Sequence, residues 1–359
     1  MNTHLIEIGL SERFNQEAAM YEDLYIARVS SQHKDLYKVI SEQGELQAEI
    51  SGKMGYNARH STDYPAVGDW VMVDRTSNEH GNAIIHHILS RKSIFERKAA
   101  GTSNRSQVVA ANIDLVFIVM SLNNDFNLRR LERYLAIAWD SMATPVIVLT
   151  KADLCDDIPE KLSLLSTVAI GVDAITTSLL DDNSYKVVRS YITSGKTAAF
   201  IGSSGVGKST LINRLMGKEV LATSGIREDD KGRHTTTHRQ LLALPDGGIV
   251  IDTPGMRELQ IESADLSSSF SDIEEYAAHC RFNDCKHESE PRCAVKAAIE
   301  DGELSPERLA SYKKLQKEAK YQNLNAIERE REKINNMFGS MSAMKQISKQ
   351  IKQKNKVNL

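Results

Sequence analysis

The sequence of 359 residues contains no long apolar run. A membrane-spanning helix needs roughly 20 consecutive apolar residues, and no segment approaches that length. Residues 1–16 also lack the basic stretch followed by an apolar one that a secretory signal requires. We therefore expect a cytoplasmic protein that makes no contact with a membrane.

Cysteine is scarce and unevenly distributed. The chain has four cysteines, and three of them fall between Cys280 and Cys293. Disulfides are rare in a reducing compartment, so this cluster indicates metal binding. A strong net charge is also missing, because 45 basic residues nearly balance 48 acidic ones. The overall charge therefore does not indicate a nucleic-acid binder, although residues 333–359 hold six Lys and no acidic residue.

The N-terminal part contains a series of short β-rich runs. Five of them, with glycines between or near them, lie at residues 24–31, 36–40, 46–52, 67–74 and 83–89. Five short strands at this spacing favour a small closed barrel, and an OB-like fold is one of few five-stranded solutions. The alternative is a different small barrel or a sandwich that serves only for packing.

The pattern changes to strand, helix, strand after residues 107–114. Buried-strand runs at 115–121 and 144–150 flank an amphipathic helix at 128–142. Another strand leads into residues 202–209, and 247–255 supplies one more that ends in a turn. This alternation predicts a mostly parallel sheet with helices on both faces, which binds ligands at the carboxyl ends of its strands.

The predicted fold class is multidomain α/β with four parts. They are an OB-like barrel with an N-terminal extension at 1–105, a nucleotide-binding α/β domain at 106–268, a helical metal-binding domain at 269–335 and a basic tail at 336–359. The tail has low complexity, and we expect it to be disordered when unbound. We expect a monomer, because no heptad pattern or large apolar helix face stands out.

A phosphate-binding loop is the strongest motif. Residues 202–209 read GSSGVGKS and match G-x-x-x-x-G-K-[ST] between a strand and a helix. The glycines let main-chain amides wrap phosphates, Lys208 reaches the β- and γ-phosphates, and the Ser209 hydroxyl binds Mg²⁺. The residues predicted to bind the nucleotide here are Gly202, Ser203, Ser204, Gly205, Val206, Gly207, Lys208, Ser209 and Thr210.

A second motif, D-T-P-G at residues 252–255, closes another apolar strand. In phosphate-loop hydrolases the acidic residue, here Asp252, holds Mg²⁺ directly or through water, and the amide of Gly255 can sense the γ-phosphate. Polar residues 227–239 lie between the two motifs and predict a segment that orders on binding. A threonine among 235–237, for which we take Thr236, completes the Mg²⁺ shell.

The third motif reads the base. T-K-A-D at residues 150–153 ends a strand, and the carboxylate of Asp153 accepts hydrogen bonds that guanine offers and adenine does not. Lys151 lays its aliphatic stem across the base plane. On its own the tetrapeptide is equally consistent with a solvated charge pair. Together with the other two motifs it predicts GTP as the nucleotide.

Cys280, Cys285, His287 and Cys293 place three thiols and one imidazole within 14 residues. They form a full tetrahedral set for Zn²⁺, and four protein ligands leave no open position, so the metal is expected to be structural. His279 adjoins the cluster as an alternative imidazole, but we prefer His287.

The motifs occur in the order of a GTPase that has been cut and rejoined, with the base-reading element before the phosphate loop. Together with GDWV at 68–71, GRHTTTHR at 232–239 and the C-x4-C-x-H-x5-C cluster, this order resembles the circularly permuted ribosome-assembly GTPases of the RsgA/YjeQ family over nearly the whole chain. The resemblance implies an OB-fold barrel, a permuted GTPase domain at 106–268 and a zinc-binding domain. It also implies hydrolysis of GTP to GDP in late maturation of the small ribosomal subunit, with 16S rRNA bound and hydrolysis stimulated by the subunit.

Three positions bear on how closely the chain follows the usual GTPase pattern. Thr150 stands where many GTPases have Asn, although the family tolerates Thr, and Ser178 is the best match for the loop that supports the base. Met256 follows D-T-P-G where a Gln positions water in Ras-like proteins, and a methionine cannot do this by hydrogen bonding. Local chemistry and the resemblance both indicate His234 as the catalytic group, alongside Lys208.

Two other hypotheses remain open from the sequence. A binding module that holds GTP without turning it over is favoured slightly by Met256. A small-molecule kinase would use the same phosphate loop, but no acceptor site is recognisable.

Overall fold

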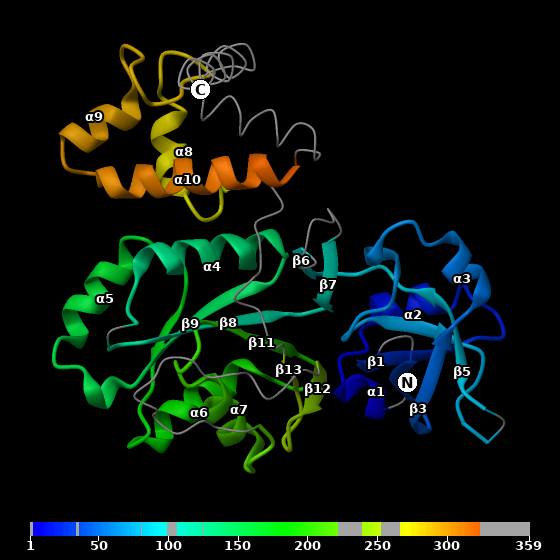
Figure 1. Ribbon diagram of the computed structural model, residues 1–359. Helices are drawn as coiled ribbons and strands as arrows, with labels where there is room; N and C mark the ends of the chain where they lie inside the picture. Colours follow the sequence, from blue (N-terminus) through cyan, green and yellow to red (C-terminus); the bar gives the residue numbers. More distant parts are fainter. Residues whose placement is uncertain are drawn as a thin grey trace, which may run out of the picture.

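The computed structural model describes residues 3–33, 36–79, 81–98, 106–123, 125–221, 239–252 and 266–323. Among these, a barrel, a central sheet with helices and a helical C-terminal region follow one another (Figure 1). The barrel and the central sheet are continuous, because their strands join in one sheet of 11 strands in the order β10-β9-β8-β11-β13-β12-β1-β2-β3-β5-β4.

The N-terminal part forms a closed barrel of five strands. Its elements are α1 (Thr3–Glu7), α2 (Glu12–Ala18), β1 (Tyr25–His33), β2 (Leu36–Ser41), β3 (Gly44–Ile50), α3 (Gly52–Asn57), η1 (Ser61–Asp63), β4 (Trp70–Val73) and β5 (Ala83–Ile88). The barrel closes because β1 pairs with both β2 and β4. Alternate residues such as Val29, Val39 and Val71 fill its interior. The predicted five-stranded barrel is confirmed.

A hairpin leads from the barrel into the central sheet. It consists of β6 (Ile94–Lys98) and β7 (Ser106–Ala111), which pair as a separate antiparallel sheet. The boundary predicted at residue 105 therefore falls between two paired strands. The limits of the four domains stay predictions, and the tail at 336–359 lies outside the described residues.

The central sheet is mostly parallel, as predicted. Its elements are β8 (Leu115–Ser121), α4 (Leu128–Asp140), β9 (Thr144–Thr150), η2 (Ala152–Leu154), α5 (Ile158–Ser166), β10 (Ala174–Thr176), α6 (Asp182–Tyr191), β11 (Thr197–Ile201), α7 (Lys208–Met216), β12 (Gln240–Ala243) and β13 (Ile249–Asp252). Among these strands, β12 is the antiparallel one. Figure 1 shows α4 over one face and α6 and α7 against the other. The residues of β8 alternate accordingly, with Ile118 in the core of the α4 side and Phe117 and Val119 in the core of the opposite side.

A buried arginine lies where the barrel meets the central sheet. Arg28 of β1 donates to the carbonyl of Gly68 at 3.2 Å, to Oγ1 of Thr197 in β11 at 2.9 Å and to the carbonyl of Ile8. Burial lowers the pKa of Arg28 to about 10, so the guanidinium stays charged at neutral pH. Beside it, Ser31 of β1 pairs with Gln240 of β12.

The C-terminal region contains α8 (Ser271–Ala277), α9 (Ala294–Glu300) and α10 (Pro306–Asn323), which lie beyond α4 (Figure 1). A buried ion pair joins the two parts, because Arg308 of α10 donates to Glu132 of α4 at 2.9 Å. Arg308 also bonds Asp272 of α8 at 2.9 Å and lies 4.2 Å from the ring centre of Phe270. No helix in the described part of the chain is long and apolar enough to span a membrane.

The packing at Gly68 generates a first prediction. Gly68 has a φ of +94°, and a Cβ on it would lie 2.2 Å from the carbonyl oxygen of Ala111. Gly68→Ala should lower the melting temperature, because backbone strain of about 1–2 kcal/mol is joined by a collision between the barrel and β7. Thermal unfolding followed by circular dichroism measures the effect.

Gly81→Ala is the matched control. Gly81 has a similar φ of +105°, but nothing lies within 4 Å of its added Cβ. We expect the loss in melting temperature for Gly68→Ala to be at least about twice that for Gly81→Ala. Equal losses of melting temperature in the two variants would show that the collision with Ala111 does not destabilise the fold.

Candidate functional site

The three predicted nucleotide motifs meet at one edge of the central sheet. β9 ends at Thr150, β11 at Ile201 and β13 at Asp252. These strands run parallel, with β8 between β9 and β11 and with β11 beside β13. Their carboxyl ends therefore lie together although the motifs are far apart in the sequence.

The phosphate-binding loop takes its shape from glycines at the end of β11. Gly202 has a φ of +147°, and a Cβ on it would lie 2.1 Å from the carbonyl oxygen of Val119 in β8. Gly207 has a φ of +99° directly before α7 begins at Lys208. Only glycine combines these backbone angles with such close packing, so the loop can turn its amides toward a bound phosphate.

Lys208 bends back over the loop from the first turn of α7. Its ammonium donates to the carbonyl of Gly202 at 2.7 Å and to that of Ser203. Asp252 faces the same charge from the end of β13. Burial raises the pKa of Asp252 to about 6, while Lys208 acts in the opposite direction. A cation at this position would favour the ionised carboxylate, as a Mg²⁺-binding aspartate requires.

The base-reading loop is held by a neighbouring loop that the sequence indicated only weakly. Ser178, which follows β10, donates its hydroxyl to Oδ1 of Asp153 at 2.7 Å. This bond is the main reason that the pKa of Asp153 is lowered. The amide of Ala152 also donates to the carbonyl of Thr177 at 3.1 Å. The Asp153 carboxylate is therefore fixed and ionised at the end of β9, and the structure places Ser178 in contact with it.

Thr150 contacts the phosphate-binding loop. Its side chain is buried, and Oγ1 donates to the carbonyl of Val206 at 2.6 Å. Its Cβ and methyl group lie 3.9 Å from the position that a Cβ of Gly207 would take. The hydroxyl thus links the end of β9 to the loop after β11. Thr150 is among the predicted GTP-binding residues, and the structure places its side chain against the phosphate-binding loop.

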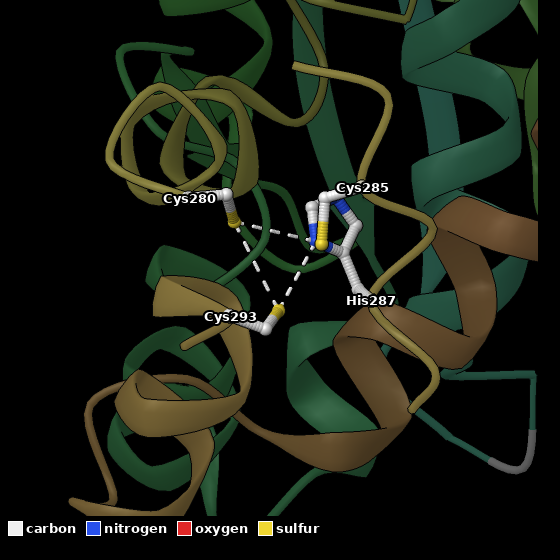
Figure 2. Close-up of side chains that lie close together, drawn as sticks. All are labelled: Cys280, Cys285, His287 and Cys293. Atoms are coloured by element: carbon white, nitrogen blue, oxygen red, sulfur yellow. Dashed lines mark hydrogen bonds between the residues drawn. The ribbon is translucent and has the colours of Figure 1, made fainter. Parts of the chain in front are cut away.

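The structure also brings the four predicted metal ligands together (Figure 2). The ligand atoms of Cys280, Cys285, His287 and Cys293 lie within 4.8 Å of one another. Sγ of Cys280 lies 3.9 Å from Sγ of Cys293, and Nδ1 of His287 lies 3.7 Å and 3.3 Å from these two sulfurs. Tetrahedral Zn–S bonds of about 2.3 Å separate two sulfurs by about 3.8 Å, so the donor set fits Zn²⁺.

The thiols of the cluster differ in acidity, because burial raises the pKa of Cys285 to about 11. Burial also opposes ionisation of Cys280, but the amides of Val295 and Ala294 at the start of α9, together with the neighbouring cysteines, lower the pKa of that thiol. A bound cation would favour the thiolate in both. Burial lowers the pKa of His287. A thiolate and a neutral imidazole are the forms that bind metals. His279 is exposed and does not belong to the cluster.

Several predicted residues cannot be placed. His234, Thr236, Gly255 and Met256 lie outside the described residues, so their roles stay predictions. Ser203, Ser204, Gly205, Ser209, Thr210 and Lys151 lie where the motifs put them, in the loops after β11 and β9 and in the first turn of α7.

The chain is similar to a family of known proteins along most of its length. The model of the RsgA GTPase family matches residues 88–262. The chain is 51% identical to the small ribosomal subunit biogenesis GTPase RsgA 2 of Lactiplantibacillus plantarum, over 97% of this chain and 98% of that protein.

Two solved structures are similar. One is the crystal structure of YjeQ from Thermotoga maritima, with a TM-score of 0.62, 28% identity and coverage of 82% of this chain and 98% of that one. The other is YloQ, described as a circularly permuted GTPase, with a TM-score of 0.60, 26% identity and coverage of 85% and 98%. The predicted order of barrel, permuted fold and helical C-terminal region is therefore confirmed.

The contact of Thr150 generates a prediction about nucleotide affinity. Thr150→Val keeps the shape of the side chain but leaves the carbonyl of Val206 without its donor. We expect affinity for GTP and GDP to fall roughly tenfold, corresponding to about 1.4 kcal/mol, because the phosphate loop loses a support. Titration with fluorescent guanine nucleotides measures this change.

Thr150→Ser, which retains the hydroxyl, is the control and should bind with nearly unchanged affinity. Discrimination between guanine and adenine nucleotides should stay the same in both variants, because the hydroxyl points to the loop. A selective loss of guanine preference in Thr150→Val would instead show that the hydroxyl contacts the base.

Proposed function

Because the chain belongs to the RsgA GTPase family, as its motifs predicted, and is a GTP-hydrolysing enzyme, we propose that it acts in late maturation of the small ribosomal subunit. One observation carries this proposal. The similarity to the Lactiplantibacillus plantarum protein, whose name states small ribosomal subunit biogenesis, extends over the segments that form the barrel, the permuted GTPase fold and the Cys/His cluster. A shared GTPase core alone would not support a shared biological role.

In this proposal Asp153 accepts hydrogen bonds from guanine, and Ser178 holds it in place. The loop at 202–210 binds the phosphates through its amides, with Lys208 at the β- and γ-phosphates. Mg²⁺ accompanies GTP and supplies charge neutralisation at the phosphates. The residues that would hold it are Ser209 and Asp252, together with Thr236.

We assign the positioning of the attacking water to His234. Met256, at the place where a glutamine positions the water in Ras-like proteins, has no hydrogen-bonding group for it. In the same proposal the amide of Gly255 contacts the γ-phosphate and so distinguishes GTP from GDP. Ordering of residues 227–239 on the subunit would bring His234 to the phosphate and thereby stimulate hydrolysis.

The proposed partner surface is RNA of the small subunit, 16S rRNA. The helical C-terminal region carries exposed basic side chains that suit phosphate contacts, namely Arg281, Lys286, Arg292, Lys314, Lys317 and Lys320. The Lys-rich tail at 336–359 would add to them. A cytoplasmic location and a monomeric state complete the proposal. Zn²⁺ is the proposed metal of the Cys/His cluster, where it would stabilise the fold.

The decisive experiment measures phosphate release from GTP with and without purified small ribosomal subunits. We expect small subunits to raise turnover at least about tenfold, because binding to them would order residues 227–239. The stimulated rate of Lys208→Ala should be about 100-fold lower, because the negative charge on the phosphates is no longer stabilised by a lysine. His234→Ala should lose a similar factor while its affinity for GTP stays within about twofold.

Large subunits are the matched control and should not stimulate. Slow turnover that no ribosomal particle changes would contradict the proposed role without contradicting GTP hydrolysis. Full stimulated turnover in His234→Ala would contradict only the assignment of the water-positioning group.

The metal assignment has its own prediction. Protein purified without chelators should contain about one equivalent of zinc, because four ligands close the coordination shell. Cys293→Ser should lose most of it, whereas Cys155→Ser should keep it, because Cys155 lies outside the cluster. Elemental analysis by mass spectrometry measures the content. Iron in place of zinc, or equal zinc in both variants, would contradict the assignment.

A further inference from the structure

The segment between His287 and Cys293 has no regular structure of its own. Residues 286–292 form no helix or strand, and most of them are exposed, so the apolar core does not hold their shape. His287 has a φ of +55° and Arg292 a φ of +58°, backbone angles that side chains other than glycine seldom adopt. Polar contacts must therefore keep His287 in the orientation that the cluster needs.

One carboxylate provides most of these contacts. Oε1 of Glu290 accepts a hydrogen bond from the amide of Lys286 at 3.1 Å. Oε2 accepts hydrogen bonds from the amides of Glu288 at 2.8 Å and Ser289 at 3.1 Å. The amides that it binds lie on both sides of His287 in the chain. Amides, foremost that of Glu288, lower the pKa of Glu290 to about 2, so the acceptor is fully ionised at neutral pH. Hydrogen bonds to an ionised acceptor are the strong ones.

We propose that Glu290 is a positioning residue of the metal site, which fixes the main chain around His287 so that Nδ1 faces the cysteine sulfurs. This inference rests on the proposed metal site. Figure 2 shows the imidazole turned toward Cys280 and Cys293, in contact with both. With the loop held in this way, metal binding does not have to order the backbone, and less affinity is lost to conformational entropy.

Two lysines hold the carbonyls of the same loop. Lys313 of α10 donates to the carbonyl of His287 at 3.0 Å, and Lys296 of α9 donates to that of Glu288 at 2.8 Å. These contacts tie the loop to the helices beside it, whereas Glu290 closes the loop on itself. The oxygens of Glu290 are engaged by amides, and Glu290 is not among the four clustered ligands. Its role is therefore support of a ligand, not coordination.

The test compares Glu290→Gln with Glu288→Gln in the full-length protein. Glutamine keeps the size of the side chain but removes the charge, and its NH₂ group cannot accept an amide hydrogen bond. Zn²⁺ affinity is measured by competition with a chromophoric chelator. We expect Glu290→Gln to bind Zn²⁺ 10- to 100-fold more weakly, about the loss seen when groups that orient metal ligands are removed.

Glu288→Gln is the matched control. The Glu288 carboxylate is 67% exposed and lies 3.7 Å from Lys313, a surface ion pair of little energy. The Zn²⁺ affinity of Glu288→Gln should stay within about twofold of that of the unmodified protein. Glu290→Asp keeps the charge but shortens the reach to the three amides, and it should also weaken binding. Circular dichroism verifies that each variant retains its helices.

Co²⁺ provides a readout of the coordination shell itself. At saturating Co²⁺ the ligand-field spectrum of Glu290→Gln should match that of the unmodified protein, because the same four ligands bind. Unchanged Zn²⁺ affinity in Glu290→Gln would overturn the positioning role, and a changed spectrum would overturn it by showing that Glu290 is a ligand. If the unmodified protein bound neither ion, the proposed metal site would fall, and this inference with it.

Discussion

The buried guanidinium of Arg28 is the interaction on which the arrangement of the first two parts depends. A charge removed from water must be matched by partners, and here they come from three segments, through Ile8, Gly68 and Thr197. Separating the barrel from the central sheet would therefore deprive this charge of its bond to Thr197. Where the two meet, Gln240 pairs with both Ser31 of the barrel and Asp252 of the nucleotide site.

The helical C-terminal region is joined to the same sheet by a second buried charge. Glu132 of α4 is fully buried, and Arg308 and Ser311 of α10 donate to its two oxygens. Because α4 lies against β8 and β9, the cysteine cluster is held at a defined position relative to the strand that ends at Thr150. The sheet edge with the three motifs, the barrel and the cluster are thus all connected to the central sheet.

The permuted order of motifs is compatible with a working site for a geometric reason. Parallel strands bring their carboxyl ends to one edge whatever their order in the chain, so the loop after β9 can precede the loop after β11 in sequence. The hydrogen bonds from Thr150 to Val206 and from Ser178 to Asp153 then join loops that the chain reaches at different times. These bonds, more than chain order, define the site.

The sequence by itself determined the local elements and the motifs from which the site is predicted. Hydrophobic runs at 115–121 and 144–150 predicted β8 and β9 with their observed limits. The spacing of glycines indicated the phosphate loop, and the spacing of cysteines and histidine indicated the cluster. All of these signals depend on residues that are neighbours in the sequence. Only the tertiary structure decided the partners of Thr150, Ser178 and Glu132. Packing brings these partners together across 56, 25 and 176 positions, and no local pattern encodes such contacts.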